Sequence, residues 1–312
     1  MDKISQMKRR KSYHKIYEQI YQDPRISLID ITQNTGLSRN TVSRYLQEMY
    51  SRGILVGPYL RMKPAQNHRE YVYLMNFTDP FFAFKGLKGF PNVLCCAVTF
   101  GDWNIMVVTN RLLDFSQLVG FQSMVARGVK GITDTPKVEY IPWVLCFTKI
   151  NEKIKEFTPA QRKSKTRTSP YLTWDNDEWK LYHAFKSNMR QKITPTLRKI
   201  NVRYETYREW MGTLDTHCTI HTEFYPEGCK TYLSCCFFFS SNHKLTVQSL
   251  FSLFPISSRI TDIGDQLFVT THLPFPHIAR RVFCTIYDLK TVKMIKKFKQ
   301  AVDLSSHGSI KK

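Results

Sequence analysis

The pattern of apolar and polar positions is most regular between Ser27 and Tyr50. Apolar residues recur there at helical spacing, and the second part of the stretch has one apolar stripe. This stripe is formed by Val42, Tyr45, Leu46 and Met49. Ser27 and Ser38 are positioned to cap two successive helices, and Gly36 can adopt the positive φ that a sharp turn needs. The pattern predicts two short helices joined by a tight turn.

The polar face of the second predicted helix carries side chains that hydrogen-bond base edges and phosphates. They are Arg39, Asn40, Thr41, Ser43, Arg44 and Gln47. In a helix-turn-helix, this face of the second helix lies in the major groove of DNA. An ordinary helical hairpin with a solvated polar face would have the same composition, so the surrounding chain must decide between the two interpretations.

The flanking segments extend this unit. A helix is expected over residues 13–21, and strands are expected over residues 54–62 and 71–77. Three helices followed by a two-stranded hairpin form a winged helix-turn-helix. We therefore expect the loop between the two strands to lie over the DNA backbone or the minor groove.

Positive charge is concentrated in three places. The net charge of +21 comes mainly from residues 1–70, 149–170 and 280–312, which suits a polyanionic partner. The phosphate contacts expected outside the recognition helix are Arg10, Lys11, Lys63 and Arg69. A solubilising N-terminal tail and a solvated hairpin tip are the alternatives for these residues.

The next segment predicts an α+β unit. With the strand at 71–77 as its first element, the expected order is β-α-β-β-α-β, the order of a ferredoxin-like unit. The further elements are a helix at 80–87, strands at 92–100 and 103–109, a helix from Asp114 to about Ala126, and a strand near 138–144.

The same order of elements is expected a second time. Three helices are indicated within residues 177–214, followed by strands and helices up to residue 298. The pair Gly101-Asp102 recurs as Gly264-Asp265. The separation between these two pairs is nearly the same as the separation between Leu37 and Val202. These markers favour an internal duplication.

The predicted organisation is therefore a winged helix-turn-helix plus a ferredoxin-like domain, repeated twice. Its segments are a first winged helix-turn-helix (1–70), a first ferredoxin-like domain (71–148), a basic linker (149–172), a degenerate second winged helix-turn-helix (173–228), a second ferredoxin-like domain (229–300) and a tail (301–312).

The layout resembles the leucine-responsive/asparagine-regulator (Lrp/AsnC) family over about residues 12–145 and, more divergently, 176–298. The similarity in the first half is carried by FGDWNIMVVTN, by the acidic cap Asp114 and by ARGVKGITDT. In the family, a turn between two central strands belongs to the effector domain, and Gly101, Trp103 and Asn104 stand where the family has Gly, Tyr and Asp. The effector-binding residues that the resemblance implies are Gly101, Asp102, Trp103 and Asn104.

The resemblance also implies a function. Members of this family bind DNA as dimers joined through their effector domains, so a tandem chain would form an intrachain pseudo-dimer. We expect a sequence-specific transcription regulator with double-stranded DNA, a small-molecule effector and a second pseudo-dimer as its partners. The second recognition helix carries Glu205 and Glu209, which phosphates would repel, beside Arg203 and Arg208.

Two other functions compete with this one. Siroheme decarboxylases are similar in layout, and acidic tetrapyrroles would suit basic side chains in the second half. These are His217, His221, His243, His272, His277, Arg280 and Arg281. Their spacing follows no motif, and the recognition helix is basic and polar, so we expect no enzyme and no catalytic residues. A protein-interaction module is the third alternative.

Cysteine spacing and hydropathy give no indication of a metal site, a membrane-spanning helix or a signal peptide. The eight cysteines include no CxxC pair, so no metal site and no cofactor are expected. No apolar run approaches the roughly 18 residues that a membrane-spanning helix needs, and the N-terminus lacks the apolar segment of a signal peptide. A cytoplasmic protein without a membrane partner is expected.

Overall fold

The computed structural model describes residues 3–159 and 169–308. The first half of the chain begins with three helices and continues into strands. Its elements are α1 (Lys3–Gln22), α2 (Leu28–Thr35), α3 (Arg39–Ser51), β1 (Leu55–Met62), β2 (Glu70–Phe77), α4 (Pro80–Leu87), β3 (Val93–Gly101), β4 (Ile105–Thr109), β5 (Phe121–Asp134) and α5 (Trp143–Lys155).

The second half again begins with three helices. Its elements are α6 (Asn176–Phe185), α7 (Ile193–Ile200), α8 (Tyr204–His217), β6 (Cys218–Phe224), a short 3-10 turn η1 (Cys229–Thr231), β7 (Leu233–Ser240), α9 (Lys244–Phe251), β8 (Ser258–Ile263), β9 (Gln266–Leu273), α10 (His277–Thr291) and β10 (Lys297–Gly308). Residues 160–168 of the expected linker and residues 309–312 of the expected tail lie outside the described residues. None of the described helices is both long and apolar enough to cross a membrane.

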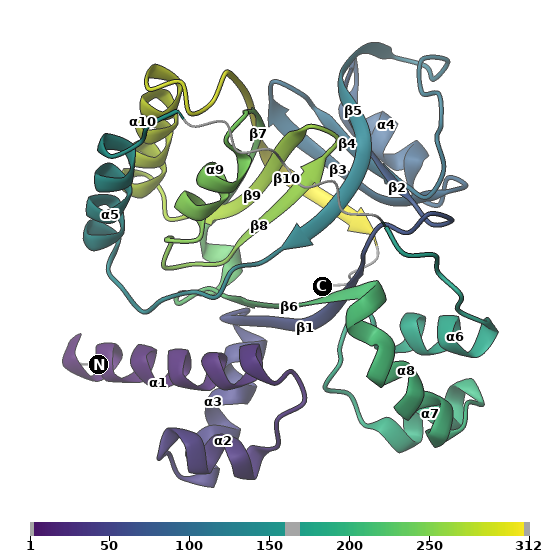
Figure 1. Ribbon diagram of the computed structural model, residues 1–312, viewed down its shortest axis with the longest axis vertical. Helices are drawn as coiled ribbons and strands as arrows, with labels where there is room; N and C mark the ends of the chain where they lie inside the picture. The colour runs from purple at the N-terminus through teal and green to yellow at the C-terminus, as the bar shows by residue number, and fades with distance from the viewer. Residues whose placement is uncertain (1–2, 160–168, 309–312) are drawn as a thin grey trace.

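Eight of the described strands close into one barrel, in the order β10-β3-β4-β2-β5-β8-β9-β7 (Figure 1). The first half contributes the run β3-β4-β2-β5 and the second half the run β8-β9-β7-β10. The two runs are joined where β5 pairs with β8 and where β10 pairs with β3. Closure satisfies the backbone groups that an open sheet would leave at its edges.

Apolar side chains fill the barrel and cover its outer surface. The interior cluster combines both halves, with Leu74 and Trp103 from the first and Phe238 and Phe268 from the second. On the outside, α5, α9 and α10 pack on the strands of the second half, whereas α4 packs on those of the first (Figure 1). The two halves therefore share one continuous barrel core.

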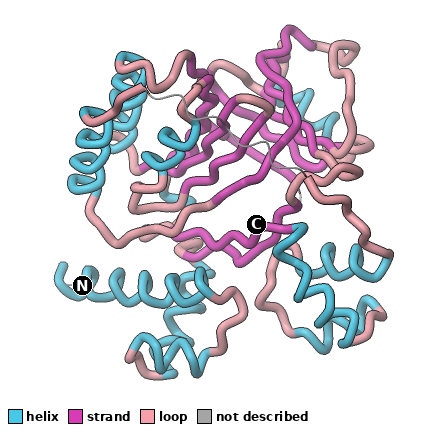
Figure 2. Tube along the Cα trace, viewed as in Figure 1, coloured by secondary structure: helices cyan, strands magenta, loops and turns pink. Residues whose placement is uncertain are grey.

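Two helical units lie side by side on one side of the barrel, and the β1–β6 ribbon runs between them and the barrel (Figure 2). The first unit, α1–α3, packs around Ile16, Ile31 and Val42. The second unit, α6–α8, packs around Leu181 and Trp210. The fold is thus a mixed α+β structure in which an N-terminal helix-turn-helix precedes a remainder rich in strands.

The expected two-stranded wing does not form. Strands occur near the predicted positions, but β1 pairs with β6 from the second half, whereas β2 pairs with β4 and β5 in the barrel. The apolar and aromatic residues of β1 and β2 favour strands, but this composition carries no information about the pairing partner.

The expected helix from Asp114 to Ala126 and the expected strand near 138–144 are also wrong. Asp114 accepts a hydrogen bond from the Ser116 backbone in a turn (2.9 Å), and residues 121–134 form the long strand β5. The chain becomes helical at Trp143, where α5 begins and continues into the expected linker. The element order β-α-β-β-α-β is therefore seen from β7 to β10 but not in the first half.

Candidate nucleic-acid interface and a buried polar cluster

The helix-turn-helix between Ser27 and Tyr50 forms as the sequence predicts. The Ser27 hydroxyl accepts a hydrogen bond from the Asp30 backbone N–H at 3.1 Å and so caps α2. Gly36 ends α2 in the left-handed region, with φ of 69°. The Ser38 hydroxyl then accepts from the Thr41 backbone N–H at 3.3 Å and caps α3. These local contacts fix the angle between the two helices.

The outward face of α3 is open. Its predicted base-reading side chains Arg39, Asn40, Ser43, Arg44 and Gln47 are exposed, whereas Val42 and Met49 on the opposite face are fully buried. The Arg44 guanidinium lies 5.4 Å from the centre of the Tyr45 ring. Within the described chain these five side chains form no hydrogen bond or ion pair. Thr41 is half-buried, and its hydroxyl lies 2.9 Å from that of Ser38.

The basic residues predicted near the N-terminus lie on α1. Lys11 is exposed, whereas Arg10 forms an ion pair with Glu227 of the second half at 2.9 Å. Arg9 contacts Tyr13 and Glu48, which ties α1 to the end of α3. Lys11 is therefore the more accessible of the two predicted contacts.

The loop after β1, expected as a wing tip, packs against the second half. The Lys63 backbone N–H donates to the His217 carbonyl at 2.7 Å, and the Lys63 ammonium donates to the Asp215 carbonyl near the end of α8. Asn67 donates to the Leu172 carbonyl at 2.9 Å. Arg69 is exposed. Lys63 therefore neutralises a helix C-terminus and is poorly placed for phosphate.

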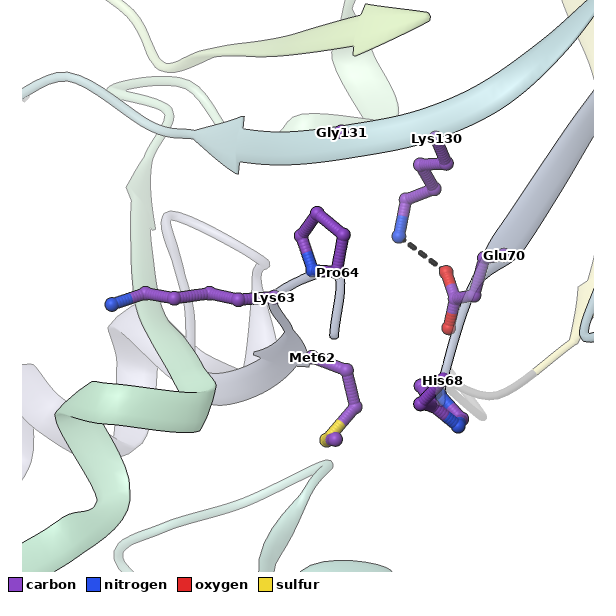
Figure 3. A pocket seen from close by; sticks show the side chains of 7 residues that line it. All are labelled: Met62, Lys63, Pro64, His68, Glu70, Lys130 and Gly131. Atoms are coloured by element: carbon purple, nitrogen blue, oxygen red, sulfur yellow. Dashed lines mark hydrogen bonds and ion pairs between the residues drawn. The ribbon is translucent and has the colours of Figure 1, made fainter. Parts of the chain in front are cut away.

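A pocket lies beside this loop (Figure 3). Glu70 and Lys130 form an ion pair on one side of it, and the Lys63 side chain points away from them. The pocket has room for about one water molecule. It is therefore too small to hold an organic effector.

The turn expected to bind an effector is built into the closure of the barrel. The Asp102 carboxylate accepts from the Gln300 backbone N–H at 2.7 Å, and the Asn104 side chain exchanges two hydrogen bonds with the Phe77 backbone. Trp103 is completely buried inside the barrel. A side chain at Gly101 would meet the Gln300 carbonyl at 2.4 Å. Gly101 and Asp102 thus join β10 to the first half of the chain, whereas Asn104 bonds within that half.

The two helical units exchange hydrogen bonds through corresponding loops. Arg25, between α1 and α2, donates to the Met189 carbonyl at 2.6 Å. Arg190, between α6 and α7, donates to the carbonyls of Pro24 (3.0 Å) and Ile26 (2.8 Å). The units are thereby fixed to each other by a reciprocal contact.

A buried polar cluster lies where the β1–β6 ribbon meets the barrel. The Glu223 carboxylate accepts hydrogen bonds from the hydroxyls of Tyr59 and Tyr225, the latter at 2.9 Å, and Arg259 lies 3.6 Å away. Burial opposes ionisation of Glu223, but Arg259 and the Tyr59 hydroxyl hold its pKa below the usual value. The sequence gives little sign of this cluster, because Tyr59, the Glu223–Tyr225 pair and Arg259 come from three distant segments.

The histidines that the sequence singled out are mostly scattered. His221 stacks on Tyr59 in the cluster, with ring centres 5.3 Å apart. Its two ring nitrogens each lie 2.7 Å from a threonine hydroxyl, those of Thr135 and Thr219. Burial lowers the pKa of His221 to about 3, so the ring is neutral at pH 7.

His272 joins the cluster through its ring contact with Tyr225, at 4.8 Å between centres. The other histidines lie elsewhere: His217 at the end of α8, His243 before α9 and His277 at the start of α10. Arg280 and Arg281 are exposed on α10. No group of three or more metal-ligating side chains occurs within the described chain.

Comparisons with known proteins identify one family match in the sequence and several similar solved structures. Residues 11–56 match a family described as winged helix-turn-helix DNA-binding. No curated protein sequence matches the chain.

Among solved structures, that of the siroheme decarboxylase NirDL is similar over 96% of this chain and 93% of its own, with a TM-score of 0.52 and 10% identity. Its complex with an iron-uroporphyrin III analogue gives a TM-score of 0.49 at 8% identity. AsnC of E. coli is 14% identical, covers 38% of this chain and 89% of its own, and gives a TM-score of 0.31.

The expectation that the chain is not an enzyme is corrected by the similarity to NirDL. A fold that extends over nearly the whole chain is shared with a decarboxylase, so this architecture is compatible with catalysis. At 10% identity the similarity establishes the fold, and a fold alone does not determine a reaction.

Proposed function

We propose that this protein is a sequence-specific DNA-binding transcription regulator that reads the major groove with α3. The observation that carries the proposal is the outward face of α3, where Arg39, Asn40 and Arg44 are exposed together. Guanidinium and amide groups form paired hydrogen bonds with guanine and adenine edges. The match of residues 11–56 to a DNA-binding family supports the same assignment.

Electrostatics favour the same partner. The sequence carries 46 lysines and arginines against 25 acidic residues. A polyanion gains affinity from such an excess through counterion release, which makes binding depend steeply on salt. Lys11 and Arg69 are exposed and are the expected phosphate contacts next to α3, whereas Arg10 must exchange its ion pair with Glu227 to reach a phosphate.

We further propose that the two halves are copies of one unit, a helix-turn-helix followed by a ferredoxin-like domain, paired as an intrachain pseudo-dimer. Reciprocal contacts support this. Arg25 and Arg190 exchange hydrogen bonds between the helical units. The Gly264 N–H donates to Val129 (3.0 Å), and the Asp102 N–H donates to Gln300 (2.8 Å), so each repeated Gly-Asp turn contacts the last strand of the other half. Such exchange is typical of a two-fold interface.

The experiment is selection from a random-sequence duplex pool with the full chain at several salt concentrations. We expect one sequence motif to be enriched. The Arg39→Ala/Arg44→Ala variant should bind that motif at least about 30-fold more weakly, because each base contact contributes about 1–3 kcal/mol.

The matched control is Lys85→Ala/Lys88→Ala, which removes two exposed positive charges at the far end of α4. This variant should retain the motif and nearly all of the affinity. Equal losses in both double variants would mean that charge alone drives binding. No enrichment by the parent chain would reject the proposal.

A reaction on an acidic tetrapyrrole is the second candidate. It is favoured by the whole-chain similarity to a siroheme decarboxylase together with the cationic groups around the barrel end, Arg61, Lys130 and Arg259. His221 is an unsuitable proton donor there, since its ring is neutral and both nitrogens are engaged. A shift of the visible bands of siroheme on adding the chain, reduced in Arg61→Gln, would favour this candidate; unchanged bands would count against it.

A further inference from the structure

The two helix-turn-helix units present different chemistry at corresponding positions. The turn before each second helix contains a residue in the left-handed region, Gly36 with φ of 69° and Asn201 with φ of 53°. Three residues after each of them, α3 begins at Arg39 and α8 at Tyr204. This alignment pairs the two helices position by position from their first residues.

The buried stripes agree with the alignment. Val42 on α3 corresponds to Tyr207 on α8, and Met49 corresponds to Leu214; all four side chains are buried. Both helices therefore pack with the same face inward and present the same positions to the outside.

The outward positions do not agree. Arg39 corresponds to Tyr204, Asn40 to Glu205, Ser43 to Arg208, Arg44 to Glu209 and Gln47 to Gly212. All ten residues are exposed. At the two central positions, α8 has carboxylates where α3 has an amide and a guanidinium. A carboxylate is repelled by phosphates, and among the major-groove edges it can accept only from the amino groups of cytosine and adenine.

Basic residues surround the acidic positions of α8. Arg203 precedes the helix and Arg208 lies within it, while Lys192, Arg198 and Lys199 belong to α7 or precede it. All five are exposed. The second unit can therefore hold the DNA backbone, which fixes position without reading sequence.

The Arg25 and Arg190 contacts fix the two units to each other. Resting on the function proposed above, we infer that this chain recognises a non-palindromic DNA site. Base readout is confined to the segment under α3, and α8 contributes contacts to the backbone of the adjacent segment. A chain built from two similar units would thus select an asymmetric sequence.

The test uses the same duplex selection with a variant in which α8 receives the outward residues of α3: Tyr204→Arg, Glu205→Asn, Arg208→Ser, Glu209→Arg and Gly212→Gln. For the parent chain we expect a single block of conserved base pairs without an inverted copy. For the variant we expect a second, inverted block about 10 base pairs away, the separation of major-groove half-sites in two-fold complexes.

An inverted repeat selected by the parent chain would overturn the inference while leaving DNA binding in place. So would a folded variant, checked by circular dichroism, that still selects one block. Enrichment by neither chain would instead reject the proposed function itself.

A separate variant, Arg208→Ala, tests the role of α8 without altering its acidic positions. It should weaken all duplexes about equally and reduce the slope of log affinity against log salt by about 1. A changed base preference in this variant would also contradict the inference.

Discussion

The arginines of the first helical unit are used in two different ways. Arg9 and Arg25 are engaged within the chain, the first with Glu48 and the second with the carbonyl of Met189. Arg39 and Arg44 form no ion pair within the described residues and lie next to uncharged hydrogen-bonding groups on α3. An arginine that already has a partner must give it up to bind DNA, so the proposal rests on Arg39 and Arg44.

His221 provides a residue-scale prediction on pH. Its pKa is about 3 in the folded chain against 6.5 for the free side chain. Below about pH 6.5 the unfolded chain therefore binds a proton that the folded chain does not, and the free energy of unfolding falls as the pH drops towards 3. His221→Asn should remove this contribution, up to about 1.4 kcal/mol per pH unit.

The measurement is urea unfolding at a series of pH values between 4 and 7. His277→Asn, a substitution at an exposed histidine, is the control and should follow the parent curve. An unchanged slope in His221→Asn would contradict the buried, neutral assignment.

At the scale of elements, local signals were sufficient wherever an element depends on its own residues. Ser27, Gly36 and Ser38 act within three or four residues of themselves, and the helices they delimit form as predicted. Strand β1 was also predicted, but its partner β6 lies more than 150 residues away. The apolar residues of the segment predict the strand but give no indication of that partner, which is why the predicted wing is wrong.

The predicted helix from Asp114 to about Ala126 overlaps the start of β5 (Phe121–Asp134) and is wrong for a similar reason. Gly128 follows the predicted helix as a C-terminal glycine would, but Gly128 and Gly131 instead permit close contact between strands. A side chain at Gly128 would approach Ile263 to 2.8 Å, and one at Gly131 would approach Asp262 to 2.8 Å. Only the position of β8 explains why both residues are glycine.

The polar cluster was missed because its chemistry is divided among distant elements. Glu223 and Tyr225 lie two positions apart in a segment of mixed polarity, as residues on a solvated strand face would. Their partners Tyr59 and Arg259 come from β1 and β8. By contrast, helical periodicity alone predicts the exposure of every base-reading candidate except Thr41, which is half-buried.

Barrel closure gives a prediction at the element scale. Gly101 has φ of 149°, and a β-carbon there would lie 2.4 Å from the Gln300 carbonyl oxygen. Gly101→Val should lower the free energy of unfolding by about 2–4 kcal/mol, because it combines backbone strain with a clash against β10. Denaturant unfolding measures this change.

Gly86→Ala is the matched control, since a β-carbon at this position in α4 meets nothing within 4 Å. This change should be neutral or stabilise by about 0.5–1 kcal/mol. If Gly101→Val unfolds at the same denaturant concentration as the parent chain, the contact between β3 and β10 is not required for stability.

At the scale of the whole molecule, the barrel joins both halves and the ribbon β1–β6 connects it to the two helical units. Residues at either junction of the half-barrels come from both halves, so the sheets cannot separate without exposing their edges. The helical units in turn are held by Arg25 and Arg190. In the proposed function, the barrel serves as the rigid support that presents α3 to DNA.

The most direct test of that proposal is photocrosslinking from defined positions. A benzophenone side chain introduced at Ser43, on the outward face of α3, should crosslink to the selected duplex. The same group at Lys85, at the far end of α4, should not. The account predicts a crosslink at Ser43 that disappears in excess unlabelled duplex; retained DNA binding with no crosslink at Ser43 would contradict it.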